Sequence, residues 1–123
     1  MLFDTDIFIW AQRGSHNAQI AIDAAEQRYL SVQTYMELLQ CAQHKNQLRK
    51  IRNFLKTFEF QVLPLTENIG HRAAIYIEEY SLSNGIRAGD ALIAATAVEH
   101  QLPLISANFK HFHAISDLVL IRF

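Results

Sequence analysis

Five short apolar segments, separated by longer stretches of helical periodicity, are the feature that most constrains the fold of this chain. Between the segments, apolar residues at helical spacing predict helices over about 7–11, 16–27, 35–45, 47–58, 67–83 and 89–101. The segments themselves have the length and residue types of buried strands and predict strands at Leu2–Asp4, Tyr29–Val32, Phe60–Leu63, Pro103–Ser106 and Leu118–Arg122.

Short strands that are apolar on both faces and alternate with helices are typical of a parallel sheet covered on both sides. The predicted fold is therefore α/β, a three-layer α/β/α sandwich with a short central parallel sheet. At 123 residues, of which 50% are hydrophobic, the chain can bury about two thirds of its unfolded surface. We expect a single domain over residues 1–123.

The apolar runs are too short to span a membrane, and Asp4 and Asp6 interrupt the first of them, which is unlike a signal peptide. We therefore expect a cytoplasmic protein without membrane contact. Its single cysteine, Cys41, cannot form an internal disulfide, and we expect it to be a buried apolar residue of a helix.

A basic stripe occupies one face of the predicted helix over 47–58. The net charge of the chain is only −1, yet five of its 11 Lys and Arg residues lie between positions 45 and 56. Four of them share one helical face and form the stripe: Lys45, Arg49, Arg52 and Lys56. The stripe is either an ordinary solvated surface or a surface that contacts the phosphates of RNA.

Polar side chains follow the predicted strands where these strands end. Asp4 and Asp6 follow the first strand, Glu37 lies soon after the second, and Ser106 and Asn108 follow the fourth. In a parallel sheet the loops that leave the strand C-termini gather at one edge, where ligands bind.

Asp90 begins the most alanine-rich helix of the chain. Alanines at 88, 91, 94 and 95 would let this helix lie close to the sheet. Asp90 follows a helix and not a strand, so periodicity alone does not place it at the edge that carries the other polar residues.

Each of these residues also has a structural explanation. Thr34 and Glu37 match a capping box, Asp4 and Asn108 are suitable N-caps, and Asp90 would favour the first turn of a helix. Taken together they favour a different explanation, because converging carboxylates repel one another unless some are protonated or a hard divalent cation binds among them.

The opening "FDTDIF" admits another alternative, since Asp-x-Asp after an apolar strand is found in phosphatases of the haloacid-dehalogenase type. Asp4 would then be a nucleophile and Asp6 a general acid. The order of the later motifs argues against this, because Gly89-Asp90 precedes Ser106 and no acidic pair follows.

Three motifs resemble the PIN-domain family, and specifically the small VapC-like ribonuclease toxins of type II toxin–antitoxin pairs. They are "LFDTDIFIW" at the start, "YMELLQ" after the second strand, and "RAGDALIAATAVEHQLPLISANFKHF" near the end. The resemblance covers essentially the whole chain, and the last motif is the most specific.

The resemblance implies which residues form the site. The catalytic positions fall on Asp4, Glu37, Asp90 and Asn108, and the metal ligands on Asp4, Asp90 and Glu37. Asn108 departs from the aspartate often found at its position. Asp6 and Ser106 fall on supporting positions, and Asp6 would restore the charge missing at Asn108.

The resemblance also implies the activity and the partners. It predicts an endoribonuclease that uses Mg²⁺, with Mn²⁺ as a substitute, to cleave RNA phosphodiesters by activated water. The expected partners are a VapB-like antitoxin and a second copy of the chain in a homodimer. A PIN-like binding module with weak catalysis is an alternative prompted by Asn108.

The remaining candidates receive structural explanations. His111 and His113 lack a zinc-ligand spacing and no cysteine is near them, so we expect them to be structural or exposed. Trp10 is expected to pack the first helix against the sheet.

Overall fold

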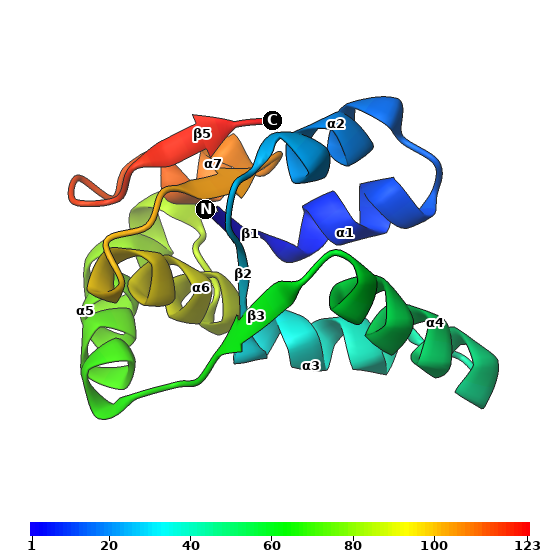
Figure 1. Cartoon of the computed structure of the whole chain (residues 1–123). Coiled ribbons are helices and arrows are strands. Elements are labelled where there is room, and N and C mark those ends of the chain that lie inside the picture. Colours follow the sequence, from blue (N-terminus) through cyan, green and yellow to red (C-terminus); the bar gives the residue numbers. More distant parts are fainter.

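All five strands form one parallel sheet in the order β3-β2-β1-β4-β5 (Figure 1). The computed structural model describes residues 1–123. The strands are β1 (Leu2–Phe3), β2 (Arg28–Ser31), β3 (Phe60–Leu63), β4 (Leu104–Ser106) and β5 (Leu120–Arg122). These bounds confirm the α/β fold class and all five predicted strands, with small shifts at their ends.

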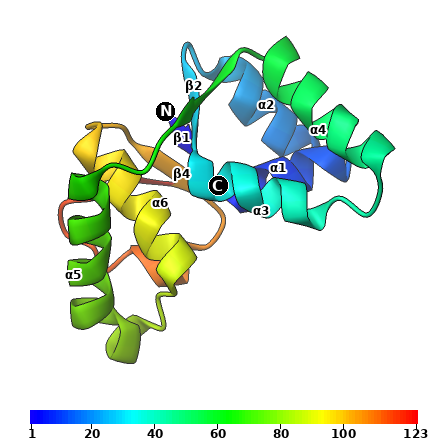
Figure 2. The ribbon, with the colours of Figure 1, turned by 90° about the horizontal axis from the view of Figure 1, so that it is seen from below.

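Seven helices surround the sheet and form the two outer layers. They are α1 (Thr5–Gln12), α2 (His16–Ala24), α3 (Val32–Cys41), α4 (Lys45–Thr57), α5 (Glu67–Asn84), α6 (Ala88–Glu99) and α7 (Phe109–Phe112). Figure 2 shows α1, α2 and α4 on one side of the sheet and α5 and α6 on the other. None of these helices combines the length and the apolar character that crossing a membrane requires.

Alternate residues of each central strand enter different cores. Leu2 and Leu104 belong to the cluster formed with α5, α6 and α7, whereas Phe3 and Ile105 belong to the cluster formed with α1, α2, α3 and α4. This is the period of two that a strand buried on both faces requires. Buried Ala91, Ala94 and Ala95 bring α6 against the sheet as predicted, although Ala88 is exposed.

Aromatic packing fixes the junction between β1 and α1. Phe3 and Phe8 lie on either side of Asp4 in the chain. The ring centroid of Phe60 is 5.4 Å from that of Phe3 and 4.9 Å from that of Phe8. Both side chains are fully buried, and each contributes roughly 2–3 kcal/mol of apolar burial. The backbone that carries Asp4 is therefore held between two anchored side chains.

The strand order places a topological switch point between β1 and β4. The chain runs from β1 outward to β2 and β3 on one side, and then returns to β4 and β5 on the other. Loops leaving neighbouring strands at such a point diverge toward opposite faces and open a crevice at the carboxyl edge of the sheet. Asp4 leaves β1, and Ser106 ends β4, at this crevice.

Several helix boundaries differ from the prediction. Helix α3 begins at Val32 because the Ser31 side chain caps it, accepting a hydrogen bond from the Gln33 backbone N–H at 2.9 Å. The predicted capping box of Thr34 and Glu37 is therefore wrong, since both residues lie inside the helix. Helix α2 ends at Ala24, three residues early, and the one-turn helix α7 was not predicted.

Two predictions of burial are wrong. Trp10 is 46% exposed, and Cys41, the last residue of α3, is exposed as well. In both helices the apolar periodicity is broader than the face that meets the core, so the pattern alone did not identify which apolar residues are covered.

Candidate functional site

Asp4 lies in the crevice between β1 and β4 and caps helix α1. Its Oδ1 atom accepts a hydrogen bond from the Thr5 backbone N–H at 2.8 Å. Its Oδ2 atom accepts one from the Ser106 hydroxyl at 2.7 Å. Asp4 is only 5% exposed. Asp4 is therefore the N-cap of α1, as its structural explanation predicted. Burying a carboxylate nevertheless costs free energy that capping a helix does not require.

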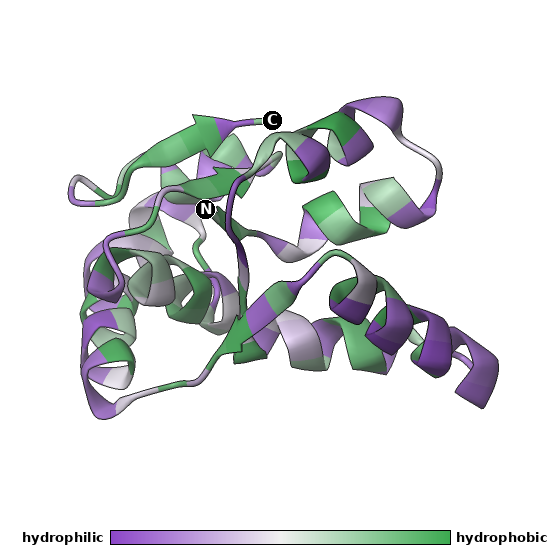
Figure 3. Cartoon of the chain, in the orientation of Figure 1, coloured by the Kyte–Doolittle hydropathy of each residue, from purple (hydrophilic) through white to green (hydrophobic).

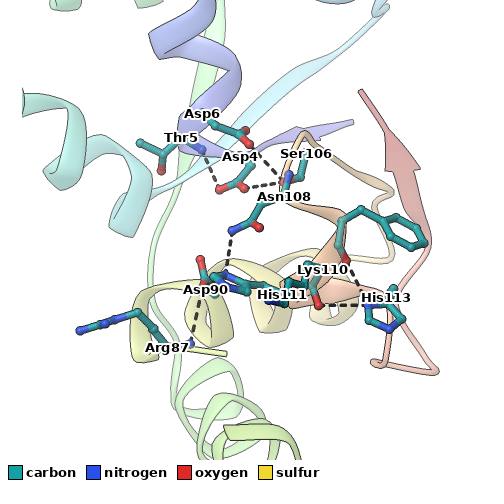
Figure 4. Close-up of polar contacts among 11 residues, drawn as sticks. Asp4, Thr5, Asp6, Arg87, Asp90, Ser106, Asn108, Lys110, His111 and His113 are labelled. Carbon is teal, nitrogen blue, oxygen red and sulfur yellow. Dashed lines mark hydrogen bonds and ion pairs between the residues drawn. The ribbon is translucent and has the colours of Figure 1, made fainter. Parts of the chain in front are cut away.

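Asp6 lies beside Asp4 in the first turn of α1 (Figure 4). Its Oδ2 atom accepts a hydrogen bond from the Ala107 backbone N–H at 3.0 Å. Its Oδ1 atom is buried and has no hydrogen-bond partner in the protein. A buried carboxylate oxygen without a partner is costly, which marks this position as one that suits a positive ligand.

Ser106 joins the two strands. Its hydroxyl donates to Asp4 and accepts a hydrogen bond from the Asn108 backbone N–H at 2.9 Å. The residue is completely buried. Ser106 therefore orients Asp4 and the loop that carries Asn108 at the same time.

Glu37 reaches the site from the second turn of α3. Its Oε2 atom accepts a hydrogen bond from the Thr5 hydroxyl at 2.8 Å, and its Oε1 atom accepts one from the Gln33 side-chain amide at 3.0 Å. Because Thr5 follows Asp4 directly, the carboxylate of Glu37 lies next to the β1–α1 junction. One side of Glu37 borders a hollow of about 450 Å³.

Gly89 brings Glu37 close to the start of α6. A Cβ atom at Gly89 would lie 3.0 Å from Glu37 Oε1 and 3.2 Å from Gln33 Nε2, closer than ordinary packing allows. A side chain larger than glycine at this position would require the ends of Glu37 and Gln33 to shift by a few tenths of an ångström. Asp90 follows Gly89 immediately, so Glu37 lies beside the turn of α6 that carries Asp90.

Asp90 faces α7, where it meets a histidine. Its Oδ2 atom accepts a long hydrogen bond from the Arg87 backbone N–H, at 3.4 Å, and lies 3.1 Å from Nδ1 of His111. The same ring nitrogen lies 2.7 Å from Nδ2 of Asn108. His111 therefore connects the third and the fourth predicted positions (Figure 4).

The electrostatics of the site reveal excess negative charge. Burial first, and then the nearby charge of Asp6, raise the pKa of Asp4 to about 7, and Asp90 raises it by a smaller amount. Hydrogen bonds from Ser106 and Thr5 oppose this shift. Burial likewise raises the pKa of Asp6, against hydrogen bonds from the backbone of Ala107 and Ile7. Asp4 and Asp6 therefore lack positive compensation within the chain.

The donor set fits a hard divalent cation. It consists of carboxylate oxygens that repel one another and include one orphaned buried atom, and a cation would relieve both penalties. No three Asp, Glu, His or Cys side chains are gathered into a finished metal-binding cluster. The fit thus rests on uncompensated charge around Asp4 and not on a complete cage of ligands.

The structure brings together six of the predicted residues: Asp4, Asp6, Glu37, Asp90, Ser106 and Asn108. It does not bring the basic stripe to them. Lys45, Arg49, Arg52 and Lys56 are exposed on α4, which lies on the face of the sheet opposite to α6. Figure 3 colours much of the α4 ribbon as hydrophilic.

Sequence reasoning missed three residues of the site. Thr5 and Gln33 hold Glu37, and His111 joins Asp90 to Asn108. His111 is partly buried and makes the hydrogen bonds expected of a structural histidine, and His113 is exposed, with its ring stacked on Phe109 and near two backbone carbonyls. Residues three apart in a helix lie on the same face, so the spacing of Asn108 and His111 indicates that they are neighbours if this segment is helical. The sequence did not predict a helix there.

Another hollow of the molecule lies away from these residues. It measures about 510 Å³ and lies between α5 and the segment at 116–117. There Arg72 pairs with Glu99 at 2.6 Å and with Asp117 at 2.8 Å. These charges compensate one another, so this hollow has the character of a structural ion-pair network.

Comparison with known proteins agrees with this geometry. The family model described as the PIN domain matches residues 1–118. A search of curated proteins found no match.

Among solved structures the chain is similar to a toxin–antitoxin complex from Klebsiella pneumoniae. The two are 33% identical with a TM-score of 0.81, and the match covers 96% of this chain and 94% of the other.

Two further structures share the fold. VapBC2 from Rickettsia felis, bound to a DNA fragment from its promoter, is 20% identical with a TM-score of 0.80, covering 99% of this chain and 97% of the other. VapBC-1 from nontypeable Haemophilus influenzae is 23% identical with a TM-score of 0.81, covering 98% and 96%. The match to the PIN model over nearly the whole length shows that the chain belongs to the PIN-domain family of nucleases, and the likenesses to solved structures show the same fold.

Proposed function

We propose that the chain is a Mg²⁺- or Mn²⁺-dependent endoribonuclease that acts as the toxin of a VapBC-type toxin–antitoxin pair. The observation that carries the proposal is the uncompensated negative charge around Asp4 at the switch point of the sheet, where Thr5 holds Glu37 beside it and Asp90 contributes to the raised pKa of Asp4. Buried, uncompensated carboxylates at the carboxyl edge of a parallel sheet are the arrangement that metal-dependent phosphodiester hydrolysis requires.

Asp4 and Asp90 are the proposed metal ligands, with Glu37 as a third. A divalent cation bound there would supply a polarised phosphate and a water of lowered pKa. Ser106 and the Thr5 backbone hold the Asp4 carboxylate in place. Thr5 and Gln33 hold Glu37, so that its carboxylate can orient the attacking water and accept its proton.

Asn108 contributes a neutral amide at the fourth position. The buried carboxylate of Asp6 lies near it in the crevice, with Oδ2 bound to the Ala107 N–H and Oδ1 free of partners. We propose that Asp6 supplies the charge that Asn108 lacks, which argues for an active nuclease and against a PIN-like module that only binds.

The phosphatase alternative receives no support from the geometry. A general acid must be free to meet a leaving group, but Oδ2 of Asp6 is occupied by the Ala107 backbone and Oδ1 is buried. Incubation with a phosphate monoester such as para-nitrophenyl phosphate tests this directly, and rapid turnover would restore that alternative.

The proposed partners follow from the similar structures. Since these are described as a toxin–antitoxin complex and as VapBC, we propose that this chain binds a VapB-like antitoxin and forms a homodimer. Co-purification with the product of the neighbouring reading frame, followed by light scattering of the chain alone, tests both proposals.

The activity is tested with purified chain and a mixture of transfer, ribosomal and messenger RNA. We expect cleavage with Mg²⁺ or Mn²⁺ and none in EDTA. Asp4→Asn and Asp90→Asn should each lower the rate by at least about a thousandfold while circular dichroism remains that of the folded protein. Glu99→Gln, which alters an acid at the far end of α6, serves as the control. Full activity of either aspartate variant contradicts the proposal.

A further inference from the structure

An exposed cluster of aromatic and basic side chains borders the candidate site on the side of α7 and β5. Its members, which we call the α7–β5 cluster, are Phe109, His113 and Arg122. Phe109 directly follows Asn108 in the chain, and Arg122 is the parallel neighbour of Ser106 in the sheet. Because paired strands lie about 4.8 Å apart, the cluster begins where the acidic crevice ends.

The rings of Phe109 and His113 form a short stack. Their centroids are 5.3 Å apart and their planes differ by only 14°. The Nδ1–H of His113 donates to the carbonyl oxygen of Lys110 at 3.0 Å, which holds the imidazole in this orientation (Figure 4). The two rings are therefore already arranged in parallel, as successive members of an aromatic stack are.

Packing of α7 does not explain this stack. Phe112, in the same helix, is completely buried and anchors α7 in the core. Phe109, in contrast, is 38% exposed, and His113 is exposed as well. Since Phe112 already supplies the apolar contact, the stacked rings remain at the surface, where a planar ligand can reach them.

The third member of the cluster is a cation without a carboxylate partner. The guanidinium carbon of Arg122 lies 4.9 Å from the ring centroid of Phe109, which is a cation–π contact. Arg122 takes part in no ion pair. The only acid between residues 100 and 123 is Asp117, which is paired with an arginine of α5. A locally basic surface therefore lies directly beside the acidic crevice.

From these observations we infer that the α7–β5 cluster binds one nucleotide of single-stranded RNA next to the phosphodiester that is cleaved. The base stacks on the rings of Phe109 and His113, and the guanidinium of Arg122 pairs with a phosphate of the same strand. Aromatic side chains hold unpaired bases in this way, and the planar fork of arginine matches a phosphate. The inference rests on the proposed ribonuclease function and adds to it a subsite for unpaired RNA.

Binding of a labelled single-stranded RNA of mixed sequence to the full chain tests the stacking. The Asp90→Asn background prevents cleavage, and fluorescence anisotropy measures the affinity. Phe109→Leu combined with His113→Gln removes both rings and should weaken binding about fivefold or more. Phe109→Tyr combined with His113→Phe keeps two rings that can stack and should bind as tightly as the parent. Melting curves establish that both variants are folded.

A strand of the same length without bases identifies what the rings contact. The protein with both rings should bind this ribose-phosphate strand about fivefold or more weakly than it binds the RNA. The variant without rings should bind the two strands equally, because bases and rings lose the same interaction. Equal binding of both strands by the protein with rings would mean that no base is stacked, and it overturns the subsite even if a ring variant fails to fold.

The salt dependence of binding tests the phosphate contact. Arg122→Gln should reduce the slope of log affinity against log salt by about 0.7, the value for one phosphate of a single strand. Arg122→Lys keeps the charge and should keep the slope. An unchanged slope in Arg122→Gln overturns the pairing of Arg122 with the backbone.

The outcomes separate this inference from the proposed function. Equal affinity of the variant without rings and of its matched control overturns the subsite, while RNA cleavage by the natural chain would still support the nuclease. Binding that depends on the rings, in a chain that cleaves no RNA with Mg²⁺ or Mn²⁺, supports the subsite and overturns the nuclease. A chain that neither binds nor cleaves RNA overturns both.

Discussion

The Ser106 hydroxyl donates a hydrogen bond to the Asp4 carboxylate at 2.7 Å, between residues 102 positions apart in the chain. This contact joins the ends of β1 and β4, the two strands that flank the switch point. Because Asp4 is buried, this hydrogen bond is one of the few interactions that favour its charged form.

Ser106→Ala should therefore reduce nuclease activity about tenfold, since a hydrogen bond to a buried charged group contributes about 1.5–3 kcal/mol. The variant also leaves the Asn108 backbone N–H without its acceptor. RNA cleavage under single-turnover conditions measures the effect. Ser83→Ala, at an exposed serine near the end of α5, should not change the rate, and an unchanged rate for Ser106→Ala would show that Asp4 needs no such support.

Gly89→Ala should impair activity without destabilising the fold. The added methyl group would lie 3.0 Å from Glu37 Oε1 and shift that carboxylate by a few tenths of an ångström, which strains its hydrogen bond with Thr5. Alanine also favours a helix over glycine by up to about 1 kcal/mol. We expect an unchanged or slightly raised melting temperature and a rate lowered about tenfold.

Gly70→Ala provides the matched control for that prediction. Gly70 lies in α5, and a Cβ atom there would meet nothing within 4 Å. This variant should gain stability and keep full activity. Equal activity of the two variants would mean that the position of Glu37 relative to α6 does not matter for cleavage.

In EDTA, the free energy of unfolding should fall as the pH rises from about 4 to about 7. Burial and Asp6 raise the pKa of Asp4 from 3.8 to about 7 in the folded protein. Between these values the folded state holds a proton that the unfolded state has lost, so raising the pH favours unfolding, by up to a few kcal/mol. Urea unfolding at pH 5 and pH 8 measures the change.

Asp4→Asn should flatten this pH dependence, since an amide does not titrate. At pH 8 the variant should be more stable than the natural protein in EDTA, and Mg²⁺ should stabilise the natural protein far more than the variant. Identical pH profiles for the two proteins would place the responsible charge elsewhere.

Charge reversal on the basic stripe should weaken RNA binding if this surface contacts phosphates. Arg49 and Arg52 are exposed on α4, away from the acids. Arg49→Glu and Arg52→Glu together should lower affinity and reduce the slope of log affinity against log salt by about 2. Filter binding with the inactive Asp90→Asn background measures it.

The control for this prediction is Arg13→Glu, compared with Arg49→Glu alone. Both residues are exposed arginines, and the two changes alter the net charge equally. An equal loss of affinity would indicate a general effect of charge, and the stripe would then be an ordinary solvated face.

The sequence alone determined the layers of this protein and the chemistry available at one edge of its sheet. Apolar periodicity records which face of a strand or helix is covered, because burial depends on the direction of each side chain. It therefore located all five strands and the amphipathic helix α4 to within one or two residues. It also placed Asp4 and Ser106 at strand ends, where parallel topology brings them together.

Only the tertiary structure decided how Glu37, Asp90 and His111 meet. Apolar periodicity contains no information about the distance between separate helices and strands. The prediction that Asp90 lies near Asp4 came from the resemblance to the PIN-domain family and not from periodicity. The side chains of Glu37 and Gln33 lie where a Cβ at Gly89 would crowd them, and the contact of His111 with Asp90 depends on the unpredicted turn of α7. Such contacts arise from packing between elements, so they become visible only when the chain is folded.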